Sequence, residues 1–247
     1  MNVNHHVNAV KRTVGGRTLD AGEAHVVTLS RSYATDAADL WDACTNAERL
    51  PRWFAPVHGD LSLGGKYRVE GNASGTILTC DPPRTFTATW EFGGGVSWIE
   101  LRIVEEGPVQ SRMQLDHISL VGDEMWPQYG PGAVGLGWDL ALLGLAIHLE
   151  TGESVPEEFK EEQWATTGAG REYIRDAGEG WYAAQVTSGE DAAVARRAAD
   201  MVSLRQALGL ESWHLHGVSF GTRIALELIR IDEGAVLSAV LDPPMPP

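Results

Sequence analysis

One segment of the 247-residue sequence has the spacing of a serine nucleophile. Gly217-Val218-Ser219-Phe220-Gly221 has the form G-x-S-x-G and lies between a strand-like run, WHLHGV, and a helix-like run, TRIALELIRI. The two glycines permit a tight, strained turn from strand to helix that exposes the serine hydroxyl. The chemistry of such a turn would be acyl transfer, as in a hydrolase or peptidase acting through Ser219.

A serine nucleophile also needs a histidine base and an acid that orients the base. No histidine follows Ser219, and the only aspartates after it are Asp232 and Asp242. In enzymes with this turn, the acid and then the histidine follow the serine in sequence. The residues therefore predict a nucleophile without a base, and a serine hydrolase is the alternative interpretation of this chain.

The histidines elsewhere offer weaker chemistry. His117 follows Asp116 at the end of a strand-like run, where it could take part in acid–base catalysis. We favour a buried ring with a hydrogen-bond partner. His214 and His216 alternate along WHLHGV without a carboxylate or thiol at a metal-ligand spacing. No dinucleotide-binding or Walker-type glycine loop occurs either, so we predict neither a metal site nor a cofactor.

The elements that must position these residues begin with a sheet. Residues 66–120 contain short strand-like runs joined by tight turns, and a further run over 24–32 is rich in β-branched residues. Short strands that follow one another through tight turns predict an antiparallel sheet. The run TFTATWEF alternates cleanly, so one face of it carries Phe86, Ala88, Trp90 and Phe92.

Two helices accompany the predicted sheet. A short one over 34–45 follows the first strand, with Thr35 or Asp36 as its cap. The other is the apolar run 133–149, which contains three glycines and Asp139 and is shorter than the ~20 residues that span a bilayer. We interpret it as a buried helix whose side chains pack against the apolar face of the sheet.

A curved sheet that grips one long helix commonly leaves a cavity between the two. We predict that Trp90 and Trp98 from neighbouring strands, and Trp138 and Leu142 from the helix, lie nearest to it, with His117 close to its opening. Core packing alone would explain these aromatic residues equally well. A helix packed solidly on the sheet would remove the main physical support for ligand binding.

The larger, N-terminal part of the sequence also resembles a known superfamily. DLWDACTNAERLPRWF, LGGKY, CDPPRTFTATWEF and GPGAVGLGWDLALLGLAIHL resemble START-like (SRPBCC) proteins, most closely homologues of the activator of the heat-shock-protein ATPase and polyketide-cyclase-like proteins. The resemblance covers about residues 18–197. It implies a helix-grip fold with a cavity for a small hydrophobic ligand, and it implies no single chemistry.

The C-terminal residues 200–247 resemble a different family, the α/β-hydrolases of the proline-iminopeptidase type. SLRQALGLESWHLHGVSFGTRIALELI and VLDPPMPP carry this resemblance. The strands that precede the nucleophile in that fold are replaced by the START-like sheet, so we interpret the segment as a fused fragment. It should retain strands over 213–218 and 235–241 and a helix over 222–231.

These observations predict an α+β fold, a helix-grip antiparallel sheet wrapped round a long helix, with extra helices and a C-terminal α/β fragment. The expected divisions are a flexible arm over 1–23, the START-like domain over 24–152, an acidic helical extension over 153–198 and the hydrolase-like fragment over 199–247.

Composition limits the partners. Lys and Arg total 19 against 34 Asp and Glu, a net charge of −15, which argues against binding of nucleic acid or an anionic membrane. Cys44 and Cys80 are too few for a disulfide framework and suit a reducing compartment, so we expect a cytoplasmic protein. The leading hypothesis is non-catalytic binding of a small apolar ligand. A homodimer, or a protein partner for the acidic helices, remains open as a third interpretation.

Overall fold

A computed structural model describes residues 3–122, 126, 130–156, 159, 164, 167–199, 213–218 and 236–242. Its centre is an eight-stranded antiparallel sheet with the order β1-β2-β8-β7-β6-β5-β4-β3. The strands are β1 (Lys11–Leu19), β2 (Gly22–Tyr33), β3 (Val57–Gly59), β4 (Lys66–Val69), β5 (Ser74–Asp81), β6 (Thr85–Phe92), β7 (Gly95–Gly107) and β8 (Gln110–Leu120).

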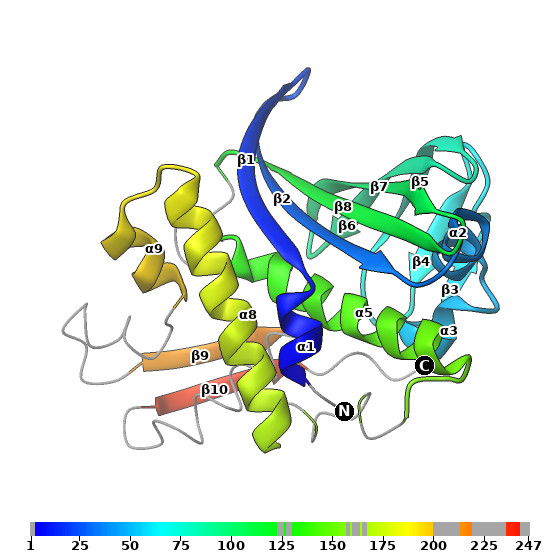
Figure 1. Ribbon diagram of the computed structural model, residues 1–247. Coiled ribbons are helices and arrows are strands. Elements are labelled where there is room, and N and C mark those ends of the chain that lie inside the picture. The colour runs from blue at the N-terminus through cyan, green and yellow to red at the C-terminus, as the bar shows by residue number, and fades with distance from the viewer. Residues whose placement is uncertain are drawn as a thin grey trace.

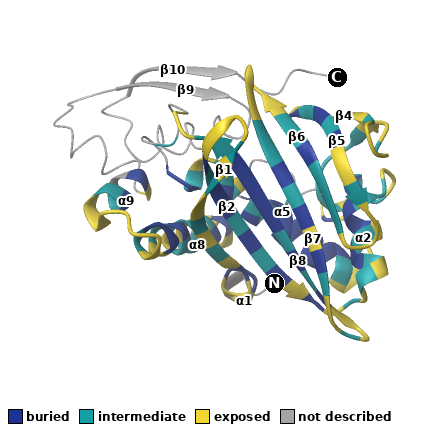
Figure 2. Ribbon diagram, turned by 90° about the horizontal axis from the view of Figure 1, so that it is seen from above, coloured by how far each residue is buried: buried dark blue, intermediate teal, exposed yellow. Residues whose placement is uncertain are grey.

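The helices cover one face of this sheet, called here the inner face (Figure 1). Seen from above, the sheet lies in front of α5 and α2 (Figure 2). The helices are α1 (Val3–Asn8), α2 (Ala37–Thr45), α3 (Leu50–Trp53), α5 (Gly132–Thr151), α8 (Gly168–Thr187) and α9 (Ala192–Ala199). The predicted α+β, helix-grip arrangement is confirmed.

Local sequence explains where the first two helices begin. The side chain of Asp36 accepts a hydrogen bond from the backbone N–H of Asp39, as expected for one of the two predicted caps of α2. Helix α3 carries Pro51 in its first turn, where the missing N–H of proline removes no helical hydrogen bond.

The prediction of a flexible arm over residues 1–23 is wrong. Within that range, residues 3–8 form α1 and residues 11–19 form β1, and β1 pairs with β2 along its whole length, from Lys11 opposite Ser30 to Leu19 opposite Gly22. The charged residues and the Gly15-Gly16 pair of β1 are not typical of a strand, so the sequence pattern does not predict one here. The guanidinium of Arg12 is bound by the carboxylate of Asp139 on α5, so its charge does not expel the strand from the fold.

Helix α5 is the core helix of the fold. By length and apolarity alone it could cross a membrane, but much of it is buried inside the protein. Two of its glycines permit close approach of neighbouring elements. A Cβ atom on Gly135 would lie 2.3 Å from the Trp181 ring, and one on Gly144 would lie 2.3 Å from the backbone oxygen of Trp53.

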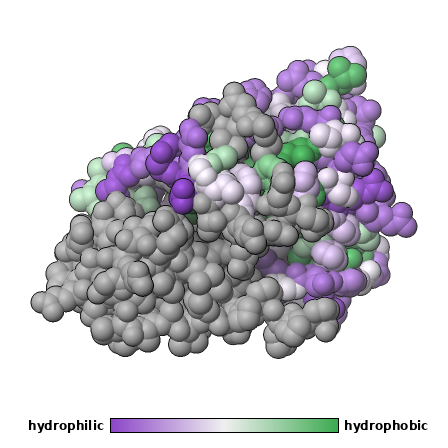
Figure 3. Space-filling view, turned by 90° about the horizontal axis from the view of Figure 1, so that it is seen from below, coloured by the Kyte–Doolittle hydropathy of each residue, from purple (hydrophilic) through white to green (hydrophobic). Residues whose placement is uncertain are grey.

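Helix α8 packs beside α5 and β1 (Figure 1). Its residues Tyr173 and Trp181 are fully buried, while Ile174 and Tyr182, also predicted to dock on the body, are half-buried. The acidic side chains Glu172, Asp176 and Glu179 lie on the partly or fully exposed side of the helix. On the face seen from below, the described residues are mostly hydrophilic, with separate hydrophobic patches (Figure 3).

The C-terminal segment contributes two further strands. Strands β9 (Trp213–Val218) and β10 (Val236–Asp242) form a two-stranded sheet and pair in parallel, Trp213 lying opposite Val236. Both strands agree with the sequence prediction to within one residue. The predicted helix over 222–231 and Ser219 lie outside the described residues, so the hydrolase-like origin of this segment stays a prediction.

Candidate functional site

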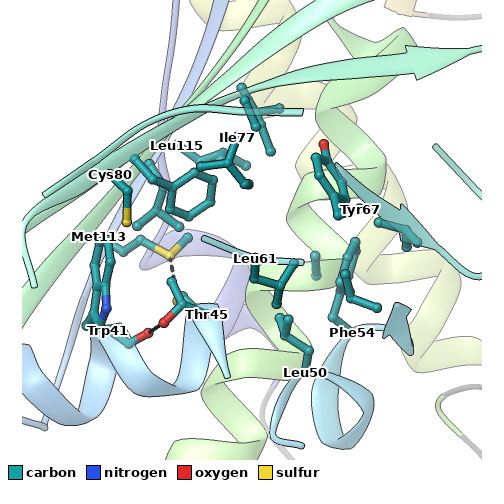
Figure 4. Close-up of a pocket in the computed structure, with 18 of the residues that line it drawn as sticks. Trp41, Thr45, Leu50, Phe54, Leu61, Tyr67, Ile77, Cys80, Met113 and Leu115 are labelled. Atoms are coloured by element: carbon teal, nitrogen blue, oxygen red, sulfur yellow. Dashed lines mark hydrogen bonds between the residues drawn. The ribbon is translucent and has the colours of Figure 1, made fainter. Parts of the chain in front are cut away.

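A cavity of about 510 Å³ lies between the inner face of strands β4–β8 and the helices α2, α3 and α5. The sequence predicts a space at this place, and the structure contains one. The lining residues drawn in Figure 4 extend from Trp41, Cys80 and Met113 on one side to Phe54 and Tyr67 on the other. Seven aromatic side chains contribute to the walls: Trp41, Trp53, Phe54, Tyr67, Phe86, Trp90 and Trp138.

Alternation along the strands builds the sheet side of the cavity. Phe86, Ala88 and Trp90 project from β6 at every second residue, and Ile99 and Leu101 do the same from β7. Ala88 is the small residue between two large aromatic ones, and it is fully buried. A short side chain between bulky neighbours leaves space that the helices do not fill.

Helix α2 and the segments beside it form the opening. Trp41 on α2 contacts Phe86 edge-on, with ring centroids 6.2 Å apart. Three other lining residues reach the surface: Ser62, Leu63 with 65% of its area exposed, and Pro82 in the turn between β5 and β6. Side chains that both line the cavity and face solvent mark where a ligand can enter.

Five polar side chains of the lining are hydrogen-bonded within the protein. The donors with their acceptors are Thr45 Oγ1 to Trp41 O (2.8 Å), Ser62 Oγ to Asp60 Oδ1 (2.6 Å), Tyr67 OH to Thr89 O (2.6 Å), Trp53 Nε1 to Ala43 O (3.0 Å) and Trp138 Nε1 to His117 Nδ1 (3.1 Å). None of the described lining residues carries a carboxylate, amine, guanidinium or imidazole. The cavity is therefore apolar in its composition, and no charged side chain of the described residues lines it.

Burial keeps the titratable groups of the lining, the Cys44 thiol and the Tyr67 hydroxyl, in their protonated forms. It raises the pKa of the Cys44 thiol to about 12, and it raises the pKa of Tyr67 well above the usual tyrosine range. Cys44 Sγ lies 3.6 Å from Met113 Sδ in a sulfur–sulfur contact. Both groups are neutral at physiological pH, so neither adds a charge to the cavity.

The structure brings most of the predicted pocket residues together. Trp90, Trp138 and Leu142 line the cavity. His117 lies behind Trp138, 4% exposed, and accepts the indole hydrogen bond. That agrees with the interpretation of His117 as a buried, hydrogen-bonded ring.

The placement of Trp98 at the pocket is wrong. In the β6–β7 register Trp90 lies opposite Ser97, and Trp98 lies opposite Thr89. A shift of one residue moves a side chain to the other face of a sheet. Trp98 consequently packs on the outer face, against a small cluster formed by Ala24, Val26 and Ile118.

The same alternation separates Asp116 from His117. The Asp116 carboxylate accepts a hydrogen bond from Thr28 Oγ1 at 2.7 Å and lies 3.8 Å from the Arg17 guanidinium on the outer face. His117 packs on the inner face near Trp90 and Trp138. Consecutive strand residues point in opposite directions, so Asp116 does not orient His117 as a catalytic partner.

Sequence reasoning missed several lining residues. Tyr67 lies in a predicted strand, and Trp41 lies on the apolar stripe of a predicted helix, so their periodicity could have identified them. Trp53 and Phe54 belong to a segment interpreted as turns. These two rings lie over the sheet because of where the chain places the end of α3. The local sequence pattern does not predict that position.

Comparison with known proteins agrees with this architecture. The family model described as "Activator of Hsp90 ATPase homolog 1-like protein" matches residues 34–150. No curated protein matches the chain.

Solved structures extend the likeness. The crystal structure of CalU16 from Micromonospora echinospora is 34% identical, with a TM-score of 0.55, and the match covers 71% of this chain and 98% of CalU16. The NMR structure of CalU16 is 32% identical, with a TM-score of 0.62, covering 73% of this chain and 97% of that one.

A more distant likeness concerns the fold alone. EF2215 from Enterococcus faecalis, a conserved protein of unknown function, is 15% identical over 77% of this chain and 100% of its own, with a TM-score of 0.51. With a matching family model, a relative of more than 30% identity aligned over nearly its whole length, and a helix-grip sheet around α5, the chain belongs to the activator of Hsp90 ATPase homolog 1-like family of START-like proteins.

Proposed function

We propose that this protein binds a small apolar ligand in the cavity between the sheet and α5, without catalysing a reaction on it. The observation that carries the proposal is an apolar cavity of about 510 Å³ that no charged side chain of the described residues lines. Ligand pockets typically have volumes of ~300–1,000 Å³. An empty apolar space of this size forfeits packing contacts that a ligand would restore.

The chemistry of the lining supports binding more than catalysis. General acid–base catalysis requires a titratable group within hydrogen-bond reach of the reacting atom. The described lining has no imidazole or carboxylate, and the pKa of Cys44 is raised to about 12 by burial. Transfer of an apolar molecule from water into the cavity requires neither proton transfer nor a charged partner.

The setting we propose is the cytoplasm. Cys44 and Cys80 are both unpaired thiols, which suits a reducing compartment. With a net charge of −15, the protein should repel anionic surfaces, so the ligand rather than a membrane is the proposed partner.

Titration with the fluorescent apolar probe 1-N-phenylnaphthylamine tests the proposal. We expect saturable binding at one site per chain and loss of affinity by at least about tenfold in Ala88→Phe, because the new ring fills the cavity. Thr87→Phe is the matched control. It adds the same ring one residue away, on the outer face, and should leave binding unchanged.

Two results would contradict the proposal. If the wild-type protein bound neither this probe nor other small apolar molecules, the cavity would not be a ligand site. If Ala88→Phe bound the probe as tightly as Thr87→Phe does, with both variants folded, the probe would occupy another part of the molecule.

A further inference from the structure

The indole of Trp138 forms one end of the cavity. Phe86 lies at the other end, beside Trp41 and the exposed lining residues. Trp90 is four residues from Phe86 along β6, a distance of roughly 13 Å at the usual rise per strand residue. The ring centroids of Trp90 and Trp138 are 5.1 Å apart, so the two indoles stand together at that distance from Phe86.

Trp138 is held in place from three sides. Its ring is stacked on Phe54, with centroids 6.1 Å apart and planes inclined by 18°. Trp90 packs against it at an inclination of 57°. On the side away from the cavity, its Nε1–H donates to His117 Nδ1 at 3.1 Å. A side chain with two ring neighbours and a directed hydrogen bond has little freedom to rotate.

Beyond Trp138 the inner face of the sheet changes character. His117 on β8 lies opposite Val27 on β2, and His25 lies two residues from Val27 on the same face. The His25 ring stacks on Trp126, with centroids 3.8 Å apart. Neither histidine lines the cavity. The apolar space therefore stops at Trp138, and imidazole rings begin on the other side of it.

We infer that Trp138 limits the length of the ligand, and that His117 is the positioning residue that holds Trp138 in place. The inference rests on the proposed function. A ligand enters beside Trp41 and Leu63 and extends along β6 until it meets the indole. Because the Trp138 N–H is already donated to His117, the indole that closes the far end offers the ligand an apolar ring and no free donor of its own.

The matching ligand is a molecule with an apolar body of roughly 13 Å or less, the distance from Phe86 to Trp90. A longer apolar molecule would gain nothing from its additional length, because the additional atoms cannot pass the indole.

Competition between 1-N-phenylnaphthylamine and straight-chain primary alcohols of increasing length tests the inference. In the wild-type protein, affinity should rise by about fourfold for each added CH₂ and then stop rising at a limiting length. In Trp138→Ala the rise should continue beyond that length, giving at least about tenfold tighter binding of the longer alcohols. Trp138→Phe, a smaller change, should shift the limit by less, and Trp98→Ala on the outer face should not shift it.

His117 is tested through the same limit. His117→Leu removes the acceptor, so the limit should move toward longer alcohols. His117→Asn places an amide oxygen near the position of Nδ1 and should restore the wild-type limit. If His117 only filled space, the limiting alcohol length would be the same in His117→Leu and His117→Asn.

A measurement on the wild-type protein does not depend on the folding of any variant. The NMR resonance of the Trp138 indole N–H should shift as the alcohols approach the limiting length, while that of Trp98 should stay constant. An unchanged limit in Trp138→Ala and Trp138→Phe, or an unresponsive Trp138 resonance at every alcohol length, would overturn the inference. Failure of all alcohols and of the probe to bind would instead refute the proposed function.

Discussion

The two sides of α5 are built in opposite ways. Trp138, Ala141 and Leu142 face the sheet and leave a cavity of about 510 Å³. One residue after Trp138, on the other side of the helix, Asp139 is fully buried and fully hydrogen-bonded. The comparison teaches that the helix is anchored on the side that faces α8 and the edge strand β1, which allows the side toward strands β4–β8 to remain hollow.

The anchor is a set of four residues from three elements, called here the Asp139 cluster: Arg12, Asp139, Tyr173 and Trp181. The Arg12 guanidinium donates to both carboxylate oxygens, the shortest distance being 2.6 Å, and also to the backbone oxygens of Val7 and Val10. Trp181 Nε1 donates to Asp139 Oδ2 at 2.8 Å, and Tyr173 OH donates to the backbone oxygen of Asp139 at 2.8 Å.

Such a cluster tolerates burial because its groups are satisfied. Burial raises the pKa of Asp139, and the hydrogen bonds from Arg12 and Trp181 oppose that rise. Two buried charges repay their desolvation only when geometry and the remaining hydrogen bonds are good. Here one carboxylate joins β1, α5 and α8, segments that are far apart in sequence.

The largest expected effect comes from removing this carboxylate. Asp139→Ala leaves the Arg12 guanidinium buried without its counter-charge and should lower the free energy of unfolding by ~3–5 kcal/mol. Urea denaturation followed by tryptophan fluorescence measures the change. Asp42→Ala is the control, since it removes an acid that pairs with Arg49 at the surface and should cost no more than ~1 kcal/mol. Equal losses in the two variants would show that the Asp139 cluster does not anchor the helix.

The next effect compares two glycines on the same turn of α5. Gly135 faces α8, and an added Cβ would lie 2.3 Å from the Trp181 ring, whereas an added Cβ on Gly137 would meet nothing within 4 Å. Gly135→Ala should therefore destabilise the protein by ~1–3 kcal/mol through overpacking. Gly137→Ala should stabilise it by up to ~1 kcal/mol through helix propensity.

Thermal and urea unfolding of the two glycine variants decide the point. Stabilisation by Gly135→Ala would mean that α8 yields easily and that the packing between α5 and α8 is loose. The side of α5 that faces α8 would then not differ in rigidity from the side that borders the cavity.

The sequence predicted the hollow side of α5 better than the anchored side. Strand alternation and one long apolar run are local patterns, and they identified the sheet, α5 and the existence of a cavity. Alternation also assigns Phe86, Ala88 and Trp90 to one face. It does not fix the register between strands, so Trp98 was placed on the wrong face although its strand was correct.

The anchored side depends on contacts that local pattern does not contain. Arg12 and Asp139 are separated by 127 positions, and each alone looks like a solvent-exposed charge. Without the pair, residues 1–23 resemble a disordered arm, and Asp139 resembles an interruption of an apolar helix. Only the folded structure shows that the two charged side chains are buried as an ion pair.

The smallest effect concerns reactivity rather than stability, and it tests whether the hollow side is open to small molecules. Cys44 and Cys80 both line the cavity. Cys44 is buried and its pKa is raised to about 12, whereas Cys80 is partly exposed. Because the thiolate is the reactive form, iodoacetamide at neutral pH should modify one thiol per chain, and peptide mapping should identify it as Cys80.

The pH dependence and the ligand sharpen this result. Raising the pH from 7 to 9 should not make Cys44 reactive, since its thiol loses the proton only near pH 12. Saturating 1-N-phenylnaphthylamine should slow modification of Cys80 by at least about tenfold, because a ligand at the Trp41 end of the cavity covers the sulfur. In Cys80→Ser the native protein should remain unmodified and become reactive only in denaturant. Rapid modification of Cys44 in the native Cys80→Ser variant would mean that the cavity opens far more widely than its lining indicates. The two sides of α5 would then differ in mobility as well as in packing.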